Sequence, residues 1–396
     1  MAGATKMPRQ LLLLASLASG AAAFRLFQKR PSRTKAAASA IREDDSPISY
    51  DAPKWLPEGI GAVPSQRLQL ASLPTPIHRW KVGQAATKDV CVYIKRDDMT
   101  GCEFSGNKIR KLEFLLADAL AQGADSVITV GGIQSNHCRA TAAAARRVGL
   151  EPHIILRAED PSTDPGTVGN LLVDRMVGAK MHLVGPEEFS SKGGWTLVCE
   201  LKAELEAQHG KKPYPFPSGG SNDVGTWGYV EAIAEIQRQA ASSGMVWDRI
   251  YFACGSGGTG AGLALGMKFS GLAETTELVG LCVDDTPGFF YEKIDKIYAD
   301  LGVNLASASV LRLEDNVGLG YAQSTDEELA FILNVAQDTG VVLDPVYSGK
   351  AVRGMIQDLE RKPLPPGAKV LFIHTGGLLG VYAKAPQLAP LLPPLR

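Results

Sequence analysis

Three short segments of this sequence contain residue types that together suit one kind of organic cofactor. Lys108 follows the small-residue segment 105–107 and precedes an amphipathic stretch. A glycine-rich loop comes later, at 255–260, and the segment 374–377 later still. A lysine amine can form a Schiff base, loop amides can hold a phosphate, and Thr375 can face a ring nitrogen. These segments indicate a site for pyridoxal 5'-phosphate.

The glycine loop alone does not decide which cofactor binds. It matches the pattern G-x-G-x-x-G, follows a predicted strand and precedes a predicted helix, and Asp284 and Asp285 end the next strand. Dinucleotide-binding enzymes have the same context, because backbone amides at a helix start bind a monophosphate and a pyrophosphate alike. A nicotinamide-dependent oxidoreductase is therefore the alternative from another class. A tight turn that binds nothing is the structural alternative.

A second lysine favours pyridoxal phosphate over a dinucleotide. Lys111 lies three residues after Lys108, so the two amines share one face of the predicted helix. One amine can bind the cofactor aldehyde while the other reaches the phosphate. Two solvated lysines at a helix start are the alternative, and the small residues at 105–107 argue against it.

Longer motifs resemble those of the tryptophan-synthase-like pyridoxal phosphate enzymes, in the branch of aminocyclopropane-carboxylate deaminase and D-cysteine desulfhydrase. The motifs are IKRDD at 94–98, SGNKIRKLEF at 105–114, GGIQSNH at 131–137, LDPVYSGK at 343–350 and FIHTGGLLG at 372–380. The resemblance covers residues 65–385. It implies an α/β fold of the tryptophan synthase β type, with two parallel-sheet domains and the cofactor in the cleft between them.

The resemblance also implies a role for each candidate residue. Lys108 would carry the Schiff base, Asn136 would bond the ring's phenolic oxygen, and Thr375 would face the ring nitrogen. The implied cofactor-binding residues are Lys108, Lys111, Asn136, Ser256, Gly257, Gly258, Thr259 and Thr375. The implied substrate-binding residues are Gln134, Ser135, Asn136, Tyr321 and Tyr347. The residues expected to be catalytic are Lys108, Ser135, Tyr347 and Tyr321.

Each of these roles has a structural alternative. The segment 134–136 could be an ordinary helix cap, and either tyrosine could be a rim aromatic. A tyrosine near the imine can lend a proton or a hydroxyl donor, provided that positive charge depresses its pKa. His137 and His374 are expected to support the site rather than to act in catalysis.

One departure from the deaminases favours elimination over ring opening. The deaminases have a glutamate after the second tyrosine that can pair with the ring nitrogen, and this sequence has Ser348 there. A neutral hydroxyl partner would leave the ring a weaker electron sink. Loss of a thiolate after α-proton removal needs a weaker sink than opening of a cyclopropane ring. His137, where the deaminases typically have glutamine, points the same way.

The sequence therefore predicts a pyridoxal phosphate lyase of D-amino acid catabolism that converts D-cysteine to pyruvate, hydrogen sulfide and ammonia. Its partners are expected to be a small-molecule amino-acid substrate and a second copy of the chain in a homodimer. Aminocyclopropane-carboxylate deaminase, as main or side activity, is the first alternative. A lyase for D-serine or another D-amino acid, and a non-catalytic protein that buffers the cofactor, also stay open.

The candidate residues lie beside predicted strands and helices that alternate along the chain, which favours a parallel α/β architecture. A helix after Lys108, with Asn107 as its cap, would bury residues 109, 112, 116 and 119. A second helix would follow 131–136. The predicted strands are 91–94, 126–130, 153–157, 181–184, 249–254, 277–283 and 369–373. The predicted domains are a large one of 43–110 and 221–396, beginning with an arm at 43–75, and a small one of 111–220.

Composition and charge exclude several other classes of protein. The 396 residues are 45% hydrophobic with a formal charge of -1, which indicates a soluble globular protein without a basic stripe for nucleic acid. The six cysteines form no CxxC pair and no metal spacing with the six histidines. We expect reduced thiols and no structural metal.

Residues 1–42 have the composition of a targeting presequence. They carry eight basic residues and no acidic one, and their apolar run at 11–24 is too short to span a bilayer. A signal-like first part and a basic second part, 25–42, resemble the bipartite presequences of complex plastids. A mitochondrial presequence and a plain secretory signal are the alternatives. The mature form is expected to have no membrane segment.

Overall fold

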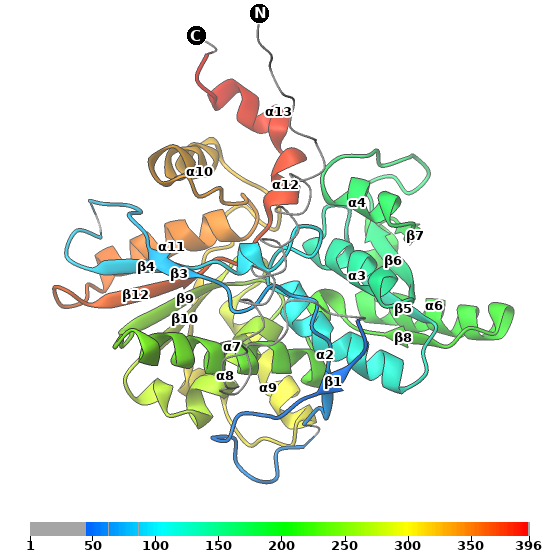
Figure 1. The fold of residues 1–396 in the computed structure, drawn as a ribbon. Helices are drawn as coiled ribbons and strands as arrows, with labels where there is room; N and C mark the ends of the chain where they lie inside the picture. Colours follow the sequence, from blue (N-terminus) through cyan, green and yellow to red (C-terminus); the bar gives the residue numbers. More distant parts are fainter. Residues whose placement is uncertain (1–44, 62, 86, 395–396) are drawn as a thin grey trace, which may run out of the picture. The chain divides into compact units, whose positions relative to one another are not determined.

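The computed structural model describes residues 45–61, 63–85 and 87–394. Its larger sheet has six strands (Figure 1). The strand order is β11-β10-β9-β12-β4-β3, and only β3 pairs antiparallel with its neighbour. The strands are β3 (Ile77–Arg79), β4 (Cys91–Lys95), β9 (Arg249–Cys254), β10 (Glu277–Cys282), β11 (Leu311–Asp315) and β12 (Lys369–Ile373). The carboxyl ends of the five parallel strands therefore meet at one edge.

A second sheet is built from the middle of the chain. Its four strands are all parallel, in the order β7-β6-β5-β8. They are β5 (Ser126–Gly132), β6 (Glu151–Arg157), β7 (Lys180–Val184) and β8 (Pro213–Pro215). A short antiparallel pair, β1 (Ile48–Ser49) and β2 (Gln66–Arg67), lies within the predicted arm.

The helices connect the strands and cover the sheets. They are α2 (Lys108–Ala121), α3 (Asn136–Arg147), α4 (Asn170–Met176), α5 (Pro186–Lys192), α6 (Gly194–His209), α7 (Asp223–Ser242), α8 (Gly258–Phe269), α9 (Pro287–Asp300), α10 (Asp326–Thr339), α11 (Ser348–Arg361), α12 (Leu378–Tyr382) and α13 (Ala385–Leu388). Short 3-10 helices are η1 (Asp97–Met99), η2 (Ser218–Gly220), η3 (Leu272–Glu274), η4 (Ser307–Ser309) and η5 (Ala389–Leu391).

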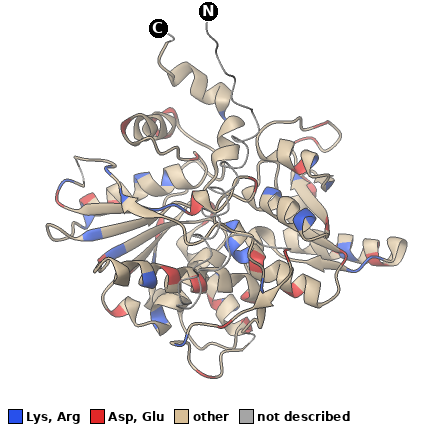
Figure 2. Cartoon of the chain, viewed as in Figure 1, with Lys and Arg blue, Asp and Glu red and all other residues tan. Residues whose placement is uncertain are grey.

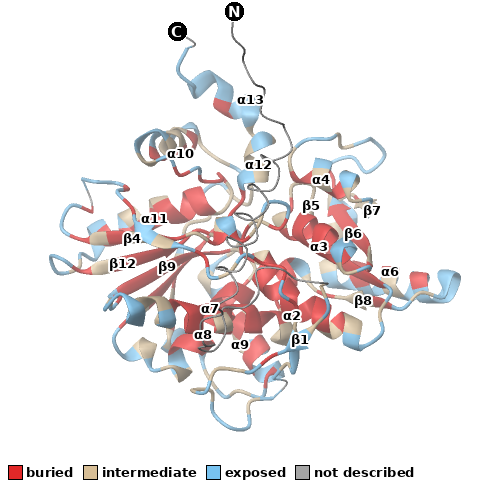
Figure 3. Ribbon diagram, in the orientation of Figure 1, coloured by how far each residue is buried: buried red, intermediate tan, exposed pale blue. Residues whose placement is uncertain are grey.

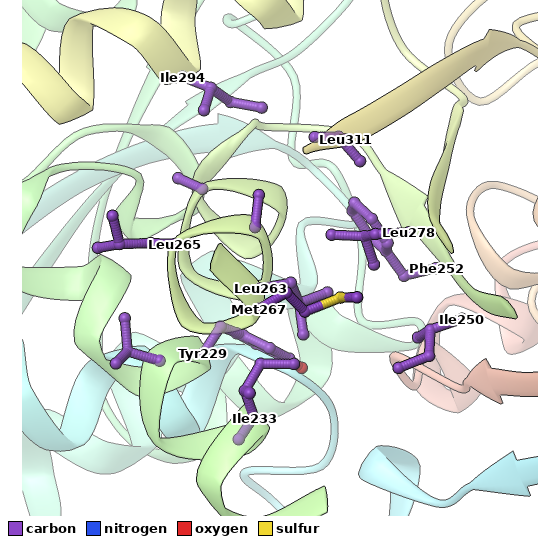
Figure 4. Packing of buried hydrophobic residues seen from close by; sticks show 14 of the residues in the cluster. Tyr229, Ile233, Ile250, Phe252, Leu263, Leu265, Met267, Leu278, Ile294 and Leu311 are labelled. Carbon is purple, nitrogen blue, oxygen red and sulfur yellow. The ribbon is translucent and has the colours of Figure 1, made fainter. Parts of the chain in front are cut away.

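The larger sheet is covered on both faces. Figure 1 shows α7 and α8 on one side of it and α10 and α11 on the other. Alternate residues of β9 enter the two cores: Ile250 and Phe252 pack with α7 and α8, as Figure 4 shows, while Tyr251 and Ala253 pack with α11. Because both faces are buried (Figure 3), the strand consists of consecutive apolar residues.

The helix that begins at Lys108 is held in place from several sides. Its predicted apolar residues are fully buried, and the same helix also buries Arg110. The Arg110 guanidinium pairs with Asp97 at 2.8 Å and with Glu235 at 3.0 Å. On another side, Glu113 accepts the backbone N–H of Leu70 at 2.7 Å, which ties the predicted arm to the helix. These buried, paired charges fix the start of α2.

The predicted architecture is confirmed. All seven predicted strands are present, each within two residues of the predicted bounds, and β1, β2, β3, β8 and β11 were not expected. Asp45 and the residues after it form a single compact unit, and the division into two domains stays a prediction. Basic and acidic side chains alternate over the described elements (Figure 2). Among the described helices, none combines the length and the apolar character needed to cross a membrane.

Candidate active site

A cavity lies between the two sheets, at the carboxyl ends of β5 and β9. Gly131 and Gly132 line it from the smaller sheet, and Ala253 and Cys254 line it from the larger one. The cavity brings together most of the predicted site residues, namely Lys108, Ser135, Asn136, Ser256, Gly257, Thr259, Tyr321, Tyr347 and Thr375. Three predicted residues, Lys111, Gln134 and Gly258, are not among its lining residues.

Lys108 is the first residue of α2 and lines the cavity, and its amine has a lower pKa than an ordinary lysine. Burial lowers the pKa of its amine to about 8, and the positive charge of Lys293 adds to this shift. A lysine amine attacks an aldehyde only in its neutral form. The surroundings of Lys108 therefore prepare it for Schiff-base formation close to neutral pH.

Asn107 does not cap the helix with its side chain, so that prediction is wrong. Its backbone is already helical, with φ -63° and ψ -19°, whereas a capping side chain needs an extended residue. The side-chain amide instead donates to Thr259 Oγ1 at 3.1 Å. This bond joins the segment before Lys108 to the glycine loop.

The glycine loop turns sharply from β9 into α8. Gly257 has a φ of +83°, which side-chain-bearing residues rarely adopt. The loop is supported from behind by Ser221, whose hydroxyl donates to Ser256 Oγ at 2.9 Å and accepts the Gly258 N–H at 3.2 Å. The first N–H groups of α8 are thereby held in place for an anion.

Lys111 lies behind this loop. Its amine donates to Gly219 O at 3.0 Å and to Ser221 Oγ at 3.4 Å, and burial lowers its pKa well below the usual value. A methyl group added at Gly258 would lie 2.8 Å from the Lys111 amine. Lys111 is therefore adjacent to the loop, and its direct contact with a phosphate stays a prediction.

Ser135 and Asn136 begin α3 at the floor of the cavity. Ser135 Oγ accepts the Cys138 N–H at 3.1 Å, so it caps the helix and lines the cavity at once. Asn136 Oδ1 accepts a hydrogen bond from Asn170 at 3.0 Å. The Gln134 side chain points elsewhere, because it donates to the backbone carbonyl of residue 168 at 2.9 Å.

Tyr321 and Tyr347 form one hydrogen-bonded pair, with 2.9 Å between their hydroxyl oxygens. A methyl group added at Gly255 would lie 2.8 Å from the Tyr347 ring, so this glycine lets the ring approach the loop. The pKa of both tyrosines is raised, mainly by burial. The condition for proton donation, a depressed tyrosine pKa, is therefore not met in this structure, and the pair can act as hydroxyl donors in hydrogen bonds.

The two histidines beside the site are bound to the protein frame. His137 lines the cavity and contacts the Thr129 hydroxyl at 2.9 Å, and burial lowers its pKa well below the usual value. Thr129 donates its own hydrogen to a backbone carbonyl, so the neutral imidazole donates through Nε2. His374 Nδ1 accepts the Gly376 N–H at 3.3 Å and supports the turn that holds Thr375.

Several lining residues were not predicted. Arg157 ends β6 and lies 5.5 Å over the ring of Phe189, and Asp284 follows β10. Burial raises the Asp284 pKa to about 6, and the charge of Asp285 adds to this. Ligands in α/β sheets bind at the carboxyl ends of the strands, a rule that could have identified Arg157 and Asp284.

The donor set fits pyridoxal phosphate. The cavity presents one buried amine for an aldehyde, a glycine loop at a helix start for a phosphate, and Thr375 for a ring nitrogen. In the described part of the chain, no group of three histidine, cysteine or acidic residues could hold a metal ion. Fold and site together define the class of a pyridoxal phosphate enzyme.

Comparison with known families identifies the group to which the chain belongs. Residues 68–376 match the family described as "Pyridoxal-phosphate dependent enzyme", and the chain is a member of this family. Membership decides the cofactor in favour of pyridoxal phosphate over a dinucleotide, and the role of the glycine loop stays a prediction. The predicted fold class and cofactor are confirmed.

Individual relatives narrow the family further. The bifunctional D-cysteine desulfhydrase/1-aminocyclopropane-1-carboxylate deaminase, mitochondrial, of Arabidopsis thaliana is 48% identical over 87% of this chain and 86% of its own. The D-cysteine desulfhydrase of Serratia proteamaculans is 38% identical over 81% and 97%. A solved ACC deaminase homologue is 38% identical, with a TM-score of 0.71 over 82% and 96%.

Proposed function

We propose that this protein is a lyase that converts D-cysteine to pyruvate, hydrogen sulfide and ammonia. The observation that carries the proposal is the convergence of the Lys108 amine and the Tyr321–Tyr347 hydroxyl pair on one cavity beside the glycine loop. The Lys108 amine is a base that can take a proton, and the tyrosine pair is a hydroxyl donor. The names of the relatives from Arabidopsis and Serratia support the same activity.

The residues that hold the ligands come from both sheets. Lys108 would bind the cofactor covalently, the loop with Ser256, Gly257 and Thr259 would hold its phosphate, and Thr375 would face its ring nitrogen. When bound, pyridoxal phosphate supplies an electron sink that stabilises negative charge on the α-carbon of the substrate.

The substrate would be held by the start of α3. The Asn136 N–H at the start of this helix and the Ser135 hydroxyl suit the carboxylate of an amino acid, whereas the Ser135 N–H is already bound to Gly132 O at 2.9 Å. Arg157 and Asp284 line the same cavity and give it both signs of charge, which suits a zwitterion. The binding role of Gln134 would require its side chain to leave the carbonyl of residue 168.

Proton transfer would use the amine and the tyrosine pair. The neutral amine of Lys108 would be the base that takes the α-proton, with Ser135 as a hydroxyl relay. The carbon–sulfur bond then breaks and the sulfur leaves as a thiolate. The protonated Tyr321–Tyr347 pair, with its raised pKa, would donate a hydrogen bond to that sulfur. The remaining aminoacrylate is hydrolysed to pyruvate and ammonia.

Ring opening of aminocyclopropane carboxylate is the second candidate activity. It is favoured by the bifunctional name of the relative that is 48% identical. The test is turnover of D-cysteine, L-cysteine, D-serine and aminocyclopropane carboxylate side by side, with sulfide and keto-acid release measured at equal enzyme concentration. D-cysteine is expected to have the highest kcat/KM. Faster ring opening than sulfide release would overturn the assignment.

We propose that two copies of the chain form a homodimer. Leu172 on α4 and Leu378 and Tyr382 on α12 are large apolar side chains exposed to solvent. The two helices are close in space, because a methyl group at Gly169 would lie 2.6 Å from the carbonyl oxygen of Leu379. Light scattering after gel filtration tests the assembly, and the double change Leu378→Glu with Tyr382→Glu is expected to give monomers.

We infer that residues 1–42 direct the protein to an organelle. They lie outside the described residues, and the inference rests on their basic, acid-free composition. Their bipartite pattern favours a plastid, whereas the Arabidopsis relative is named as mitochondrial. Imaging of a fluorescent protein fused to residues 1–42 distinguishes the two compartments.

A further inference from the structure

Lysines from two different helices approach adjacent glycines of the phosphate loop. Lys111, on α2, lies next to Gly258, where an added methyl group would be 2.8 Å from its amine. Lys293, on α9, lies next to Gly257, where an added methyl group would be 3.6 Å from Lys293 Cδ. The aliphatic stem of Lys293 therefore packs beside Gly257, the residue that directly precedes α8.

These amines have no acidic partner in contact. Among the described residues, no carboxylate oxygen lies within the 4.0 Å ion-pair distance of the amine of Lys108, Lys111 or Lys293. Lys111 donates only to neutral oxygens. Asp284 and Asp285 favour the charged form of Lys293 from a longer distance, and burial opposes it. Ammonium groups gathered without counter-ions around a helix start form a site for an anion.

The charge of Lys293 acts on the other two amines. It lowers the pKa of Lys108 and of Lys111, in addition to the effect of burial. A Schiff base would use the amine of Lys108, and Lys111 is bound to Gly219 and Ser221. The Lys293 amine lies 5.6 Å from the centroid of the Phe289 ring, and no hydrogen bond from it to a described residue is found. Its flexible stem can bring a compact, strongly charged donor to a phosphate oxygen.

We propose that Lys293 is a further ligand of the cofactor's phosphate, acting from α9 beside the loop amides and Lys111. The inference concerns the cofactor, so it does not depend on which amino acid is the substrate. No sequence motif indicates this role, because Lys293 lies outside the motifs at 94–98, 105–114, 131–137, 343–350 and 372–380.

The experiment compares two ligands that differ only in the phosphate. Apoenzyme is titrated with pyridoxal phosphate and with pyridoxal, and the visible absorbance band reports binding. Lys293→Met is expected to weaken pyridoxal phosphate about 10-fold, as for loss of a charged hydrogen bond, and to leave pyridoxal within about twofold. Lys293→Arg should retain most of the affinity. Lys296→Met, on the exposed side of the same helix and 3.4 Å from Asp300, is the matched control and should change neither ligand.

Two results would overturn the proposal. One is an unchanged dissociation constant for pyridoxal phosphate in Lys293→Met, and the other is equal weakening of both ligands, which would mark Lys293 as structural. If Lys293→Met does not fold, Lys293→Gln takes its place. Inorganic phosphate is then added to the Lys293→Gln apoenzyme and to the wild-type apoenzyme, and the rise in Tm is measured for each. A smaller rise than in wild type supports the proposal, and an equal rise contradicts it. If the enzyme binds the cofactor but does not turn over D-cysteine, the result contradicts the proposed substrate and leaves the role of Lys293 unaffected.

Discussion

The hydroxyl of Ser348 is bound to Asp344, with Oγ donating to Asp344 Oδ1 at 2.6 Å and accepting the Asp344 N–H at 2.8 Å. The same carboxylate accepts the backbone N–H groups of Val346 and Tyr347 at 3.0 Å and 2.8 Å. Ser348 is fully buried and does not line the cavity. The expectation that its hydroxyl is the partner of the ring nitrogen is therefore wrong, and Thr375 is the candidate that lines the cavity.

Substitution of these two hydroxyl residues separates stability from cofactor chemistry. Ser348→Ala leaves Asp344 with two hydrogen bonds fewer, so the free energy of unfolding should fall by about 1–3 kcal/mol with an unchanged cofactor spectrum. Thr375→Val should shift the spectrum and lower kcat for D-cysteine with little loss of stability. The measurements are urea unfolding and the visible absorbance of the holoenzyme. The reverse pattern would restore Ser348 as the partner of the nitrogen.

Lys108→Ala removes the amine expected to bind the cofactor. The visible band should disappear, and sulfide release should fall by at least about 10²–10⁴-fold, since no other neutral amine lines the cavity among the described residues. Absorbance and a sulfide assay are the measurements. Lys111→Ala serves as the comparison, because it should weaken binding but keep the band. A band that persisted in Lys108→Ala would assign the Schiff base to another lysine.

Alanine substitution at two glycines with a positive φ separates the effect of backbone strain on stability from an effect on cofactor binding. Gly257 has a φ of +83° beside the predicted phosphate site, and Gly271 has a φ of +76° with nothing within 4 Å of an added methyl group. Alanine at either position should lower stability by a similar amount, about 1 kcal/mol. Only Gly257→Ala should also weaken pyridoxal phosphate, because relief of the positive φ would move the loop amides, while the added methyl group would only contact Ile294 and Lys293 at 3.6 Å. Equal dissociation constants in the two variants would argue against the role of the loop.

The basicity of Lys108 predicts a pH dependence of cofactor capture by the apoenzyme. Burial and the charge of Lys293 lower its pKa to about 8, and the Asp284 carboxylate partly opposes this. Only the neutral amine reacts, so the association rate should rise with pH up to about 8 and level off above it. Stopped-flow absorbance between pH 6 and 10 measures the curve. In Lys293→Met the bend should move to higher pH, since a positive charge has been removed.

A buried acid away from the cavity makes a separate prediction about stability. Asp174 is fully buried, its two side-chain oxygens accept no hydrogen bond from the described residues, and burial raises its pKa to about 7. Because the folded protein holds this proton more tightly than the unfolded chain, Asp174 costs stability as pH rises from about 4 to 7. Asp174→Asn should therefore add stability at pH 8, on the order of 3 kcal/mol relative to its effect at pH 4. Urea unfolding at both pH values measures this, and an unchanged difference would contradict it.

The sequence predicted the elements of the fold better than the directions of its side chains. Apolar runs report burial, so strands such as β9 and β12 were located to the residue. The Gln134 side chain was assigned to the substrate, yet it bonds to the loop before α4, which no local pattern reveals. Asp284 reaches the cavity from the end of β10, and the stem of Lys293, on α9, reaches Gly257, both through folding of distant segments. Their spacing from Lys108 along the chain carries no signal of this proximity.

The hydrogen bond between Asn107 and Thr259 has a consequence for which aldehydes the enzyme can accept. It links the residue before the reactive amine to the loop that holds the phosphate, so the span between the two attachment points is set before any ligand arrives. An aldehyde with its phosphate on a longer or shorter arm would reach one point and miss the other. The hydrogen bond between Asn107 and Thr259 would therefore favour a cofactor with one particular distance between its aldehyde and its phosphate.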